Sequence, residues 1–379
     1  MAQASLTLRR MDPLTYASSG VDVEAGDKAV ELMKRSVLRT RRPEVIGGLG
    51  GFAGLFDAAS LTSMNHPVLA TSTDGVGTKV SVAQAMDIHH TIGFDLVGMV
   101  VDDLVVCGAE PLFMTDYIAC GKVVPERIAS IVEGIASACE EAGVALIGGE
   151  TAEHPDLLGA TEYDIAGAAT GVVEHADILG PERVLAGDVV LALASAGLHS
   201  NGFVLVGRAI DRAGWSLDRD VPEFGRTLGE ELLEPTKIYS AELLELIRTA
   251  GIDVHALCHV TGGGLVANLA RALPSHLHAR LDRATWRPQP VFGVIGRLGN
   301  VPASDLERTF NMGVGFAVLL PRDHADAAIA VLERGGTRSW VVGEVTACTD
   351  ADIESGYEVV RGTKGWHGGS VQLVGSYPH

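Results

Sequence analysis

Apolar runs of strand length alternate with segments of helical period along this 379-residue chain. Val68–Ser72 and Asp188–Leu193 are short and strongly apolar, as strands are, whereas the segment from about Thr91 to Cys107 has the length of a helix. This alternation is typical of α/β and mixed α+β proteins. Turn signals between Glu174 and Gly187 separate the chain into two halves. Because 47% of the residues are hydrophobic, a chain of this length can bury a core in each half.

The sequence therefore predicts a two-domain chain. We divide it into a flexible leader (residues 1–18), an N-terminal mixed α/β domain (19–178), a C-terminal α/β domain (179–350) and a tail (351–379). In the leader, Arg9 and Arg10 precede no apolar core of signal-peptide length. Beyond about Glu354 the residues are glycine-rich without a clear period, which favours a loose tail.

Composition argues against several classes of function. A formal net charge of −19 disfavours nucleic-acid binding, which needs basic surfaces. The most apolar run, Leu96–Cys107, is interrupted by two aspartates and is shorter than the roughly 20 residues that a membrane-spanning helix needs. The five cysteines form no Cys-x-x-Cys pair, which favours reduced thiols over a disulfide framework. We expect a cytoplasmic protein with no nucleic-acid and no membrane partner.

The segment Thr73–Lys79 follows a predicted strand and has the composition of a phosphate-binding turn. Glycines let a backbone approach phosphate closely, a carboxylate can hold a divalent cation, and a lysine can neutralise phosphate charge. The segment is not a P-loop, in which Ser or Thr follows the lysine. An ordinary strand-to-helix turn is the alternative. The predicted nucleotide-binding residues here are Asp74, Gly75, Gly77, Thr78 and Lys79.

Carboxylates from three segments form a predicted metal site. Asp102 and Asp103 interrupt an apolar helix, and burying a carboxylate is costly unless it is paired or bound to a cation. The alternative is that one face of this helix, which Asp95 would share, is solvated. Glu150 follows two glycines at the end of an apolar strand, where open α/β sheets bind ligands. Asp74, Asp103 and Glu150 could together supply the oxygen ligands that Mg²⁺ prefers.

A glycine-rich loop follows two adjacent arginines within Thr40–Phe52. Such a loop has the mobility to close over a ligand, although glycine clusters are also common in linkers. Its four glycines, which we include among the nucleotide-binding candidates, are Gly47, Gly48, Gly50 and Gly51.

The segment Ser195–Gly202 follows the strand that opens the second half. It presents an imidazole, hydroxyls and an amide at the end of that strand, from His199, Ser200 and Asn201. A lone histidine is more often a structural hydrogen-bonding residue than a catalyst, and this is the alternative for His199.

A glycine turn, Thr261–Gly264, precedes a predicted helix that begins at Leu265. Free backbone N–H groups and the helix dipole favour an anion there, and phosphate is the obvious candidate. A capped glycine turn is the alternative. His255 and His259 lie just upstream, but no third ligand stands at a suitable spacing, so we interpret their segment as a strand rather than a metal site.

Taken together and in this order, the motifs resemble those of the phosphoribosylformylglycinamidine cyclo-ligases, also called aminoimidazole ribonucleotide synthetases. Several motifs in one order are more specific than any one of them. The likeness runs to about Val345 and rests on Ser19–Asp22, Thr40–Phe52, Thr73–Lys79, Gly108–Phe113, Gly148–Glu153, His199–Gly202, Thr261–Gly264 and Phe310–Gly315.

The resemblance implies a homodimer in which the N-terminal domains pair through their sheets, with an α/β domain packed on each. It implies an enzyme of purine biosynthesis that uses ATP to close the imidazole ring of formylglycinamidine ribonucleotide. The γ-phosphate goes to the formyl amide oxygen, the amidine nitrogen attacks that carbon, and phosphate departs. ATP and Mg²⁺ are the implied cofactors.

The same resemblance implies roles for individual residues. The expected catalytic residues are His199, Asn201 and Lys34, with Lys34 and the glycine loop at the triphosphate. His199 and Asn201 would orient the reacting amide or stabilise its developing charge. The residues expected to hold the ribose phosphate are Ser200, Thr261, Gly262, Gly263 and Gly264.

Some features depart from the family pattern. Asp102 stands where the family usually has Asn, His90 where Asp is common, and His154 where Met is common. Selenophosphate synthetase and thiamine-phosphate kinase, of the same superfamily, are alternatives. The former favours a reactive cysteine near the glycine loop, and none precedes Cys107. A non-catalytic nucleotide-binding protein is a further alternative, which could dispense with the carboxylates that this chain has.

Overall fold

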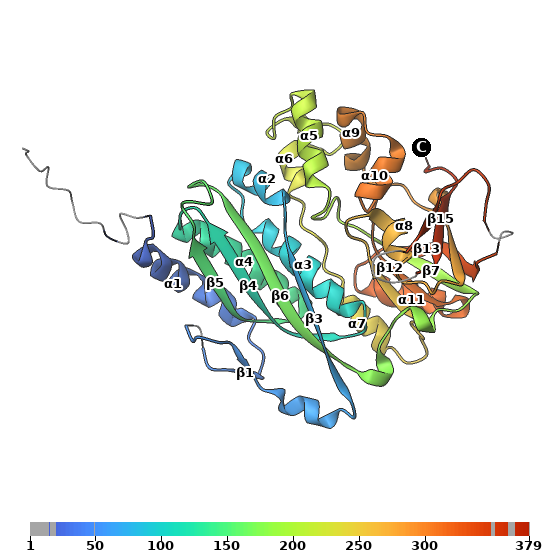
Figure 1. Ribbon diagram of the computed structural model, residues 1–379, viewed down its shortest axis with the longest axis horizontal. Helices are drawn as coiled ribbons and strands as arrows, with labels where there is room; N and C mark the ends of the chain where they lie inside the picture. Colours follow the sequence, from blue (N-terminus) through green and yellow to red (C-terminus); the bar gives the residue numbers. More distant parts are fainter. Residues whose placement is uncertain (1–14, 16–19, 49, 350–352, 363–367, 379) are drawn as a thin grey trace, which may run out of the picture.

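The computed structural model describes residue 15 and residues 20–48, 50–349, 353–362 and 368–378, which form two halves, each built on a β-sheet (Figure 1). Apart from Thr15, the predicted leader lies outside the described residues. None of the described helices is long and apolar enough to cross a membrane.

The N-terminal half contains a four-stranded sheet. Its helices and strands are α1 (Val23–Arg39), β1 (Val45–Ile46), β2 (Leu55–Phe56), β3 (Pro67–Gly75), α2 (Lys79–Met86), α3 (Thr91–Val105), β4 (Glu110–Cys120), α4 (Pro125–Ala142), β5 (Ala145–Glu153) and β6 (Tyr163–Glu174). The sheet order is β3-β6-β4-β5. β6 is antiparallel to both of its neighbours, while β4 and β5 are parallel.

Two helices of this half have boundaries that proline and glycine explain. α4 has Pro125 in its first turn and ends at Gly143, whose φ of +70° is a left-handed conformation that glycine adopts without strain. The helix predicted from about Thr91 is α3, and Gly108 lies just beyond its end. The helix predicted from about Thr91 and the strand predicted at Val68–Ser72, which lies within β3, are confirmed.

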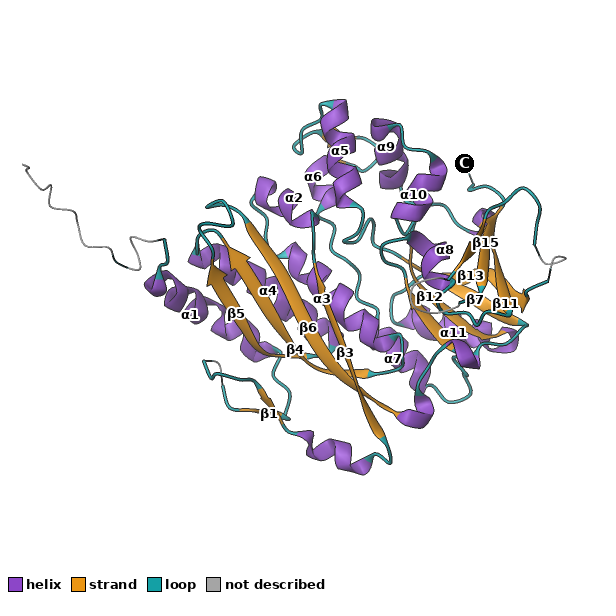
Figure 2. Cartoon of the chain, viewed as in Figure 1, coloured by secondary structure: helices purple, strands orange, loops and turns teal. Residues whose placement is uncertain are grey.

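The two faces of the four-stranded sheet differ in cover. Met114 and Ile118 of β4 are fully buried on the face that α3 and α4 cover (Figure 2). On the other face Leu69 of β3 is 63% exposed and Tyr117 of β4 is 42% exposed. The strand registers place Leu69 and Tyr117 on the same side, because paired residues share a face and successive residues alternate. We call this side the open face.

The C-terminal half contains a seven-stranded sheet. Its helices and strands are β7 (Asp188–Ala194), α5 (Phe203–Ala213), β8 (Asp220–Val221), β9 (Arg226–Thr227), α6 (Leu228–Leu232), α7 (Ser240–Arg248), β10 (Ala256–His259), α8 (Gly264–Leu269), β11 (Leu277–Asp282), α9 (Pro290–Gly299), α10 (Ala303–Thr309), β12 (Val314–Pro321), α11 (Ala325–Arg334), β13 (Ser339–Ala347), β14 (Val359–Arg361) and β15 (Ser370–Val374). The sheet order is β10-β12-β7-β13-β11-β15-β14.

Both faces of this sheet are buried. In β7, Val189 and Leu191 belong to a core that includes residues of α7 and α11. Val190 and Ala192 belong to a second core that includes residues of α8. A strand covered on both sides is a continuous apolar run rather than an alternating one, which is why Asp188–Leu193 was conspicuous in the sequence.

The end of the chain corrects a prediction. Residues 353–362 and 368–378 are not a loose tail, because β15 pairs in parallel with β11 and antiparallel with β14. Val371 and Gln372 of β15 are fully buried. A five-residue strand after a glycine-rich segment is too short for hydrophobic period to reveal it.

Helix α3 joins the two halves through buried carboxylates. Asp95 accepts hydrogen bonds from the N–H and the hydroxyl of Thr236, at 3.0 and 2.6 Å. Both carboxylate oxygens of Asp102 lie 3.1 Å from the N–H of Tyr239. Burial raises the pKa of Asp102 to about 7. Neither aspartate is exposed, so these side chains bind the segment before α7 rather than solvent.

Candidate functional site

The predicted phosphate turn is a strand, a turn and a helix in succession. β3 ends at Gly75, Gly77 has a φ of +71°, and α2 begins at Lys79. Asp74, Gly77 and Thr78 are exposed and can reach a ligand. The Oδ1 atom of Asp74 accepts the N–H of Gly75 at 2.7 Å, which fixes the carboxylate at the end of the strand.

Lys79 is turned away from this surface. Its side chain is fully buried, and Nζ donates to Oδ1 of Asp95 at 2.7 Å and to the carbonyl oxygens of Glu234 and His199 at 2.6 and 3.2 Å. An ammonium group has three donors, so none is left for phosphate. The prediction that Lys79 binds nucleotide is wrong. Lys79 instead ties the turn to the C-terminal half.

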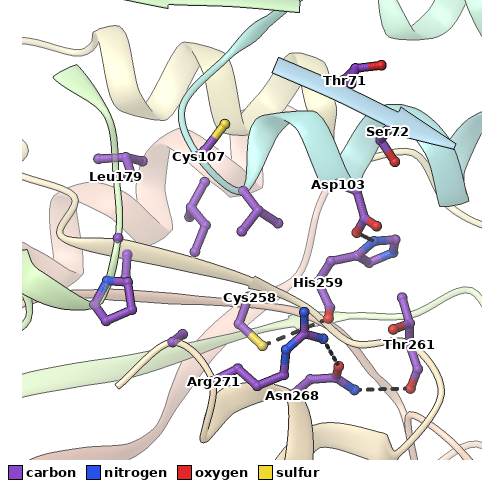
Figure 3. Close-up of a pocket in the computed structure, with 16 residues that line it drawn as sticks. Thr71, Ser72, Asp103, Cys107, Leu179, Cys258, His259, Thr261, Asn268 and Arg271 are labelled. Carbon is purple, nitrogen blue, oxygen red and sulfur yellow. Dashed lines mark hydrogen bonds and ion pairs between the residues drawn. The ribbon is translucent and has the colours of Figure 1, made fainter. Parts of the chain in front are cut away.

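A cavity of about 450 Å³ lies between the two halves, and we call it the interdomain cavity (Figure 3). β3 and the end of α3 contribute Thr71, Ser72 and Asp103 to its wall, and the segment from β10 to α8 and beyond contributes the facing residues. Figure 3 shows one polar region around Asp103 and Thr261 and an apolar region beside Leu179. A ligand with a charged group and a less polar group would fit this division.

An ion pair crosses the interdomain cavity. Nδ1 of His259 lies 2.9 Å from Oδ1 of Asp103. Burial disfavours a charged ring, but the hydrogen bond to Asp103 and the carboxylates of Asp102, Asp103 and Asp74 raise the pKa of His259 overall. The Nε2 atom of His259 is buried and has no hydrogen-bond partner among the described residues. The segment is a strand, β10, as predicted, but sequence reasoning assigned no role to its last residue, His259.

The structure separates the three predicted metal ligands. Asp74 and Asp103 both act on His259, so they lie near one another. Glu150 is on β5, three strand spacings of about 4.8 Å from β3. The pairing of Asp74 with Gly167, Gly167 with Asp116 and Asp116 with Gly149 also puts Glu150 on the opposite face from Asp74. Within one chain, Glu150 cannot share an ion with the other two.

Ser200 and His199 shape the loop after β7. The hydroxyl of Ser200 donates to the carbonyl oxygen of Val76 at 2.7 Å, so its proton is committed to the N-terminal half. Nε2 of His199 accepts the N–H of Ala196 at 3.2 Å. Burial, together with the nearby cations, lowers the pKa of His199 well below its usual value. His199 does not line the interdomain cavity, which favours the structural alternative for it.

His199 also has a strained backbone. Its φ is +61°, which is uncommon for a residue other than glycine, and such strain is typical of functional loops. The loop brings Asn201 to the glycine turn, because a Cβ atom at Gly262 would lie 3.2 Å from Oδ1 of Asn201. The structure thus brings Asn201, an expected catalytic residue, next to Thr261–Gly264, the turn expected to hold the ribose phosphate.

The glycine turn is held by a neighbouring amide. Nδ2 of Asn268 lies 3.3 Å from the carbonyl oxygens of Thr261 and Gly262 and 2.9 Å from that of Gly264. A Cβ atom at Gly264 would lie 1.9 Å from the carbonyl oxygen of Glu307, so only glycine fits there. Thr261 lines the interdomain cavity. These three carbonyl groups are thereby satisfied within the protein, and so is the N–H of Gly264, which donates to the carbonyl oxygen of Thr261 at 3.1 Å.

Sequence reasoning missed a cation at this site. Arg271 lines the interdomain cavity, and its guanidinium donates to Oδ1 of Asn268 at 3.3 Å (Figure 3). Most of its donors remain available, and a guanidinium suits phosphate recognition. The only signal in the sequence was a basic residue soon after the glycine turn.

The glycine loop lies at a second cavity, of about 600 Å³, bounded by α1, α4, β4 and β5. We call it the N-terminal cavity. Gly48, Gly50 and Gly51 line it, as does Glu150, whereas Gly47 does not. Lys34 is on α1, but its side chain is 54% exposed, pairs with Glu31 at 3.8 Å and does not line the cavity.

Both halves match one group of domains. AIR synthase related protein, N-terminal domain, matches residues 56–173, and the C-terminal domain of the same group matches residues 186–355. A thiamine-monophosphate kinase from Stenotrophomonas maltophilia K279a has the same fold, with a TM-score of 0.63 and 18% identity over 92% of this chain and 97% of that one. The structure of hydrogenase maturation protein HypE in complex with ATP matches with a TM-score of 0.59 and 20% identity, over 94% of this chain and 96% of that one. The fold is that of an AIR synthase related protein.

Relatives of higher identity define the family. A phosphoribosylformylglycinamidine cyclo-ligase of Geobacillus sp. (strain WCH70) is 48% identical over 331 residues, which cover 87% of this chain and 95% of that protein. A cyclo-ligase of Carboxydothermus hydrogenoformans (strain ATCC BAA-161 / DSM 6008 / Z-2901) is 46% identical over 338 residues, which cover 89% of this chain and 97% of that protein. The chain belongs to the phosphoribosylformylglycinamidine cyclo-ligase family, and the resemblance inferred from its motifs is confirmed.

Proposed function

We propose that this chain catalyses the ATP-dependent closure of formylglycinamidine ribonucleotide to 5-aminoimidazole ribonucleotide, with ADP and phosphate as the other products, in purine biosynthesis. The observation that carries the proposal is 48% identity to a named cyclo-ligase over most of both chains. A member of this family is a ligase that forms a carbon–nitrogen bond. Free cysteines throughout the described residues support a reducing, cytoplasmic compartment.

The reaction requires the site to stabilise the charge that develops around the formyl carbon of the substrate. The γ-phosphoryl group moves to the formyl amide oxygen, the amidine nitrogen attacks the activated carbon, and the oxygen leaves as phosphate while the nitrogen loses a proton. Catalysis of phosphoryl transfer is largely positioning and charge stabilisation. The interdomain cavity offers suitable groups: the guanidinium of Arg271, the imidazole of His259 and the hydroxyl of Thr261.

Asp74 and Asp103 fit Mg²⁺ in this reaction. Mg²⁺ is usually held by one or two carboxylates together with substrate phosphates, and it would offset the charge of the triphosphate. Asp74 is exposed at the end of β3, and the side chain of Asp103 is 44% exposed beside it. A third carboxylate is therefore not needed from the same chain.

A homodimer would complete the site. The open face carries Leu69 and Tyr117 with Thr71 and Thr115 between them, an unusual surface for a sheet that faces water. If two chains pack these faces together, β5 of one can approach β3 of the other. Glu150 would then reach the nucleotide held by the partner chain, which accounts for its separation from Asp74.

The experiment is a direct assay. Purified protein is supplied with formylglycinamidine ribonucleotide, ATP and Mg²⁺, and both aminoimidazole ribonucleotide and ADP are followed. We expect equimolar products that depend on both substrates and on Mg²⁺. Folded protein that yields no imidazole product would refute the proposal, and transfer of phosphate to thiamine phosphate would favour the kinase alternative. Sedimentation at several concentrations, with Leu69→Glu as the variant, tests the dimer.

A further inference from the structure

The end of the chain lies against the elements that carry Arg271. The residues described beyond 352 are 353–362 and 368–378, and we call them the C-terminal segment. The match to the C-terminal domain of the AIR synthase related proteins ends at residue 355, so most of this segment lies outside it. Figure 1 shows the end of the chain close to α10 and β15. The segment contributes none of the described residues that line the interdomain cavity, so any role that it has there is indirect.

The C-terminal segment contacts the backbone on both sides of Arg271. This arginine follows α8 and lines the interdomain cavity. A Cβ atom at Gly362 would lie 2.5 Å from the carbonyl oxygen of Ala270, so only a glycine lets the two backbones approach this closely. The N–H of Gly369 donates to the carbonyl oxygen of Leu273 at 2.7 Å. The stretch that carries the guanidinium is therefore held at both of its ends.

The same segment holds a carboxylate of α10. Oε1 of Glu307 accepts the hydroxyl of Tyr377 at 3.0 Å, and Arg283 donates to both oxygens of that carboxylate, at 2.7 and 2.8 Å. Arg283 also donates to the carbonyl oxygen of Leu373 in β15. The ring of Tyr377 meets that of Trp286 edge-on, with centroids 5.1 Å apart. Burial and the charge of Glu307 raise the pKa of Tyr377, so its hydroxyl remains a donor that fixes the end of the chain to α10.

Helix α10 in turn contacts the glycine turn. A Cβ atom at Gly264 would overlap the carbonyl oxygen of Glu307, so the two backbones are in direct contact. Gly264 ends the turn and begins α8, and Thr261 at the start of the turn lines the interdomain cavity. The C-terminal segment thus holds this wall of the cavity twice, through α10 at the start of α8 and directly beyond its end. A wall that is fixed before a ligand arrives lowers the cost of binding.

We propose that the C-terminal segment positions the phosphate-binding wall of the interdomain cavity, and that Tyr377 is a positioning residue that acts through α10 and α8 on Arg271. The inference rests on the proposed function, because the ligand of this wall is the ribose phosphate of the substrate. A guanidinium binds phosphate through a planar fork, so a small shift of its backbone weakens binding. Since Tyr377 does not line the cavity, its loss should affect binding of the ribonucleotide rather than the chemical step.

The kinetic test uses the whole chain and Tyr377→Phe, which keeps the ring and removes the hydroxyl. KM for formylglycinamidine ribonucleotide should rise about threefold to fivefold, with kcat and the KM for ATP within roughly twofold of the wild type. A smaller folded fraction would instead lower kcat and leave both KM values unchanged, and that outcome would overturn the proposal. In an Arg271→Ala background, Tyr377→Phe should raise KM no further, because both changes act on the same contact. Tyr357→Phe, in the same segment, is the matched control and should leave both KM values unchanged.

Hydrogen exchange measures the positioning without a substrate. The amides of α8 and of residues 270–273 should exchange about threefold faster in Tyr377→Phe than in the wild type, while those of α2 should not change. Gly362→Ala, which displaces Ala270, should have the same effect, whereas Gly207→Ala should not, because an added Cβ there meets no atom outside its own helix within 4 Å. Equal exchange of α8 in the wild type and Tyr377→Phe would overturn the inference alone. Wild type that forms no aminoimidazole ribonucleotide refutes the proposed function, whatever the exchange rates are.

Discussion

The two cavities lie at opposite edges of the four-stranded sheet and hold their charges differently. In the interdomain cavity Asp103 pairs with His259, and Arg271 donates to Asn268. In the N-terminal cavity Asp116 has no side-chain partner among the described residues. Groups that satisfy one another keep their geometry without a ligand, whereas an unpaired buried carboxyl gains most when one binds. The interdomain cavity is therefore held by its own contacts, whereas the N-terminal cavity contains a buried acid that its contacts leave unpaired.

The buried ion pair between Lys79 and Asp95, which lies where the two halves meet, should give the largest effect on stability. Lys79→Met removes the cation from Asp95 and leaves a buried, uncompensated carboxylate, so the free energy of unfolding should fall by about 3–5 kcal/mol. Urea denaturation measures it. Lys79→Met combined with Asp95→Asn should recover much of the loss. Lys28→Met, which breaks an exposed pair with Glu126, should cost at most about 1 kcal/mol, and equal losses for the two lysines would contradict the argument.

The unpaired carboxyl of the N-terminal cavity predicts a pH effect. An unfolded chain releases the proton of Asp116 near pH 4, while burial holds the folded pKa at about 7. Between these values the folded state binds a proton that the unfolded state lacks, so stability falls as pH rises. Relative to Asp116→Asn, the wild type should lose about 2–4 kcal/mol between pH 4 and pH 7.5. Urea denaturation at each pH measures this, and parallel pH profiles for the two proteins would contradict it.

Asp116 and Lys79 show what could and could not be predicted from the sequence. Long elements with clear stops, such as α3 and α4, were predictable from period, glycine and proline. Asp116 carried a signal that was overlooked, because it is in phase with buried Met114 and Ile118 of one strand. Lys79 carried none. Its direction is set by acceptors 16, 120 and 155 residues away in the chain.

The three predicted metal ligands are separated within one chain for a related reason. Asp74 and Glu150 each follow a predicted strand, and both were assigned to one ion because carboxylate oxygens are the ligands that Mg²⁺ prefers. Their separation depends on sheet order, in which β6 and β4 stand between β3 and β5, and on the face that each strand residue occupies. Neither property is local, so no motif could report it. Arg271 and His259 likewise gain a role only because α3 folds against the C-terminal half.

The charge pair of the interdomain cavity can be broken at Asp103. Asp103→Asn should lower kcat/KM roughly 100-fold, because it weakens both the proposed Mg²⁺ site and the charge on His259. Stability should change by less than about 1 kcal/mol, since the carboxylate is partly exposed. Rates at limiting and saturating Mg²⁺ measure the effect. Asp305→Asn on α10 is the control, and activity within twofold of the wild type in Asp103→Asn would remove Asp103 from the site.

The smallest expected effect concerns Arg271. Arg271→Ala should raise KM for the ribonucleotide about tenfold with a smaller change in kcat, because a guanidinium at the cavity wall binds a phosphate in the ground state as well as in the transition state. Arg271→Lys should recover only part of the loss, since an ammonium is a point charge without the planar fork. Arg287→Ala, at another exposed position, serves as the control. An unchanged KM in Arg271→Ala would mean that the cation serves the fold of the α8 region rather than the substrate, and the contrast between the two cavities would then rest on Asp103 and His259 alone.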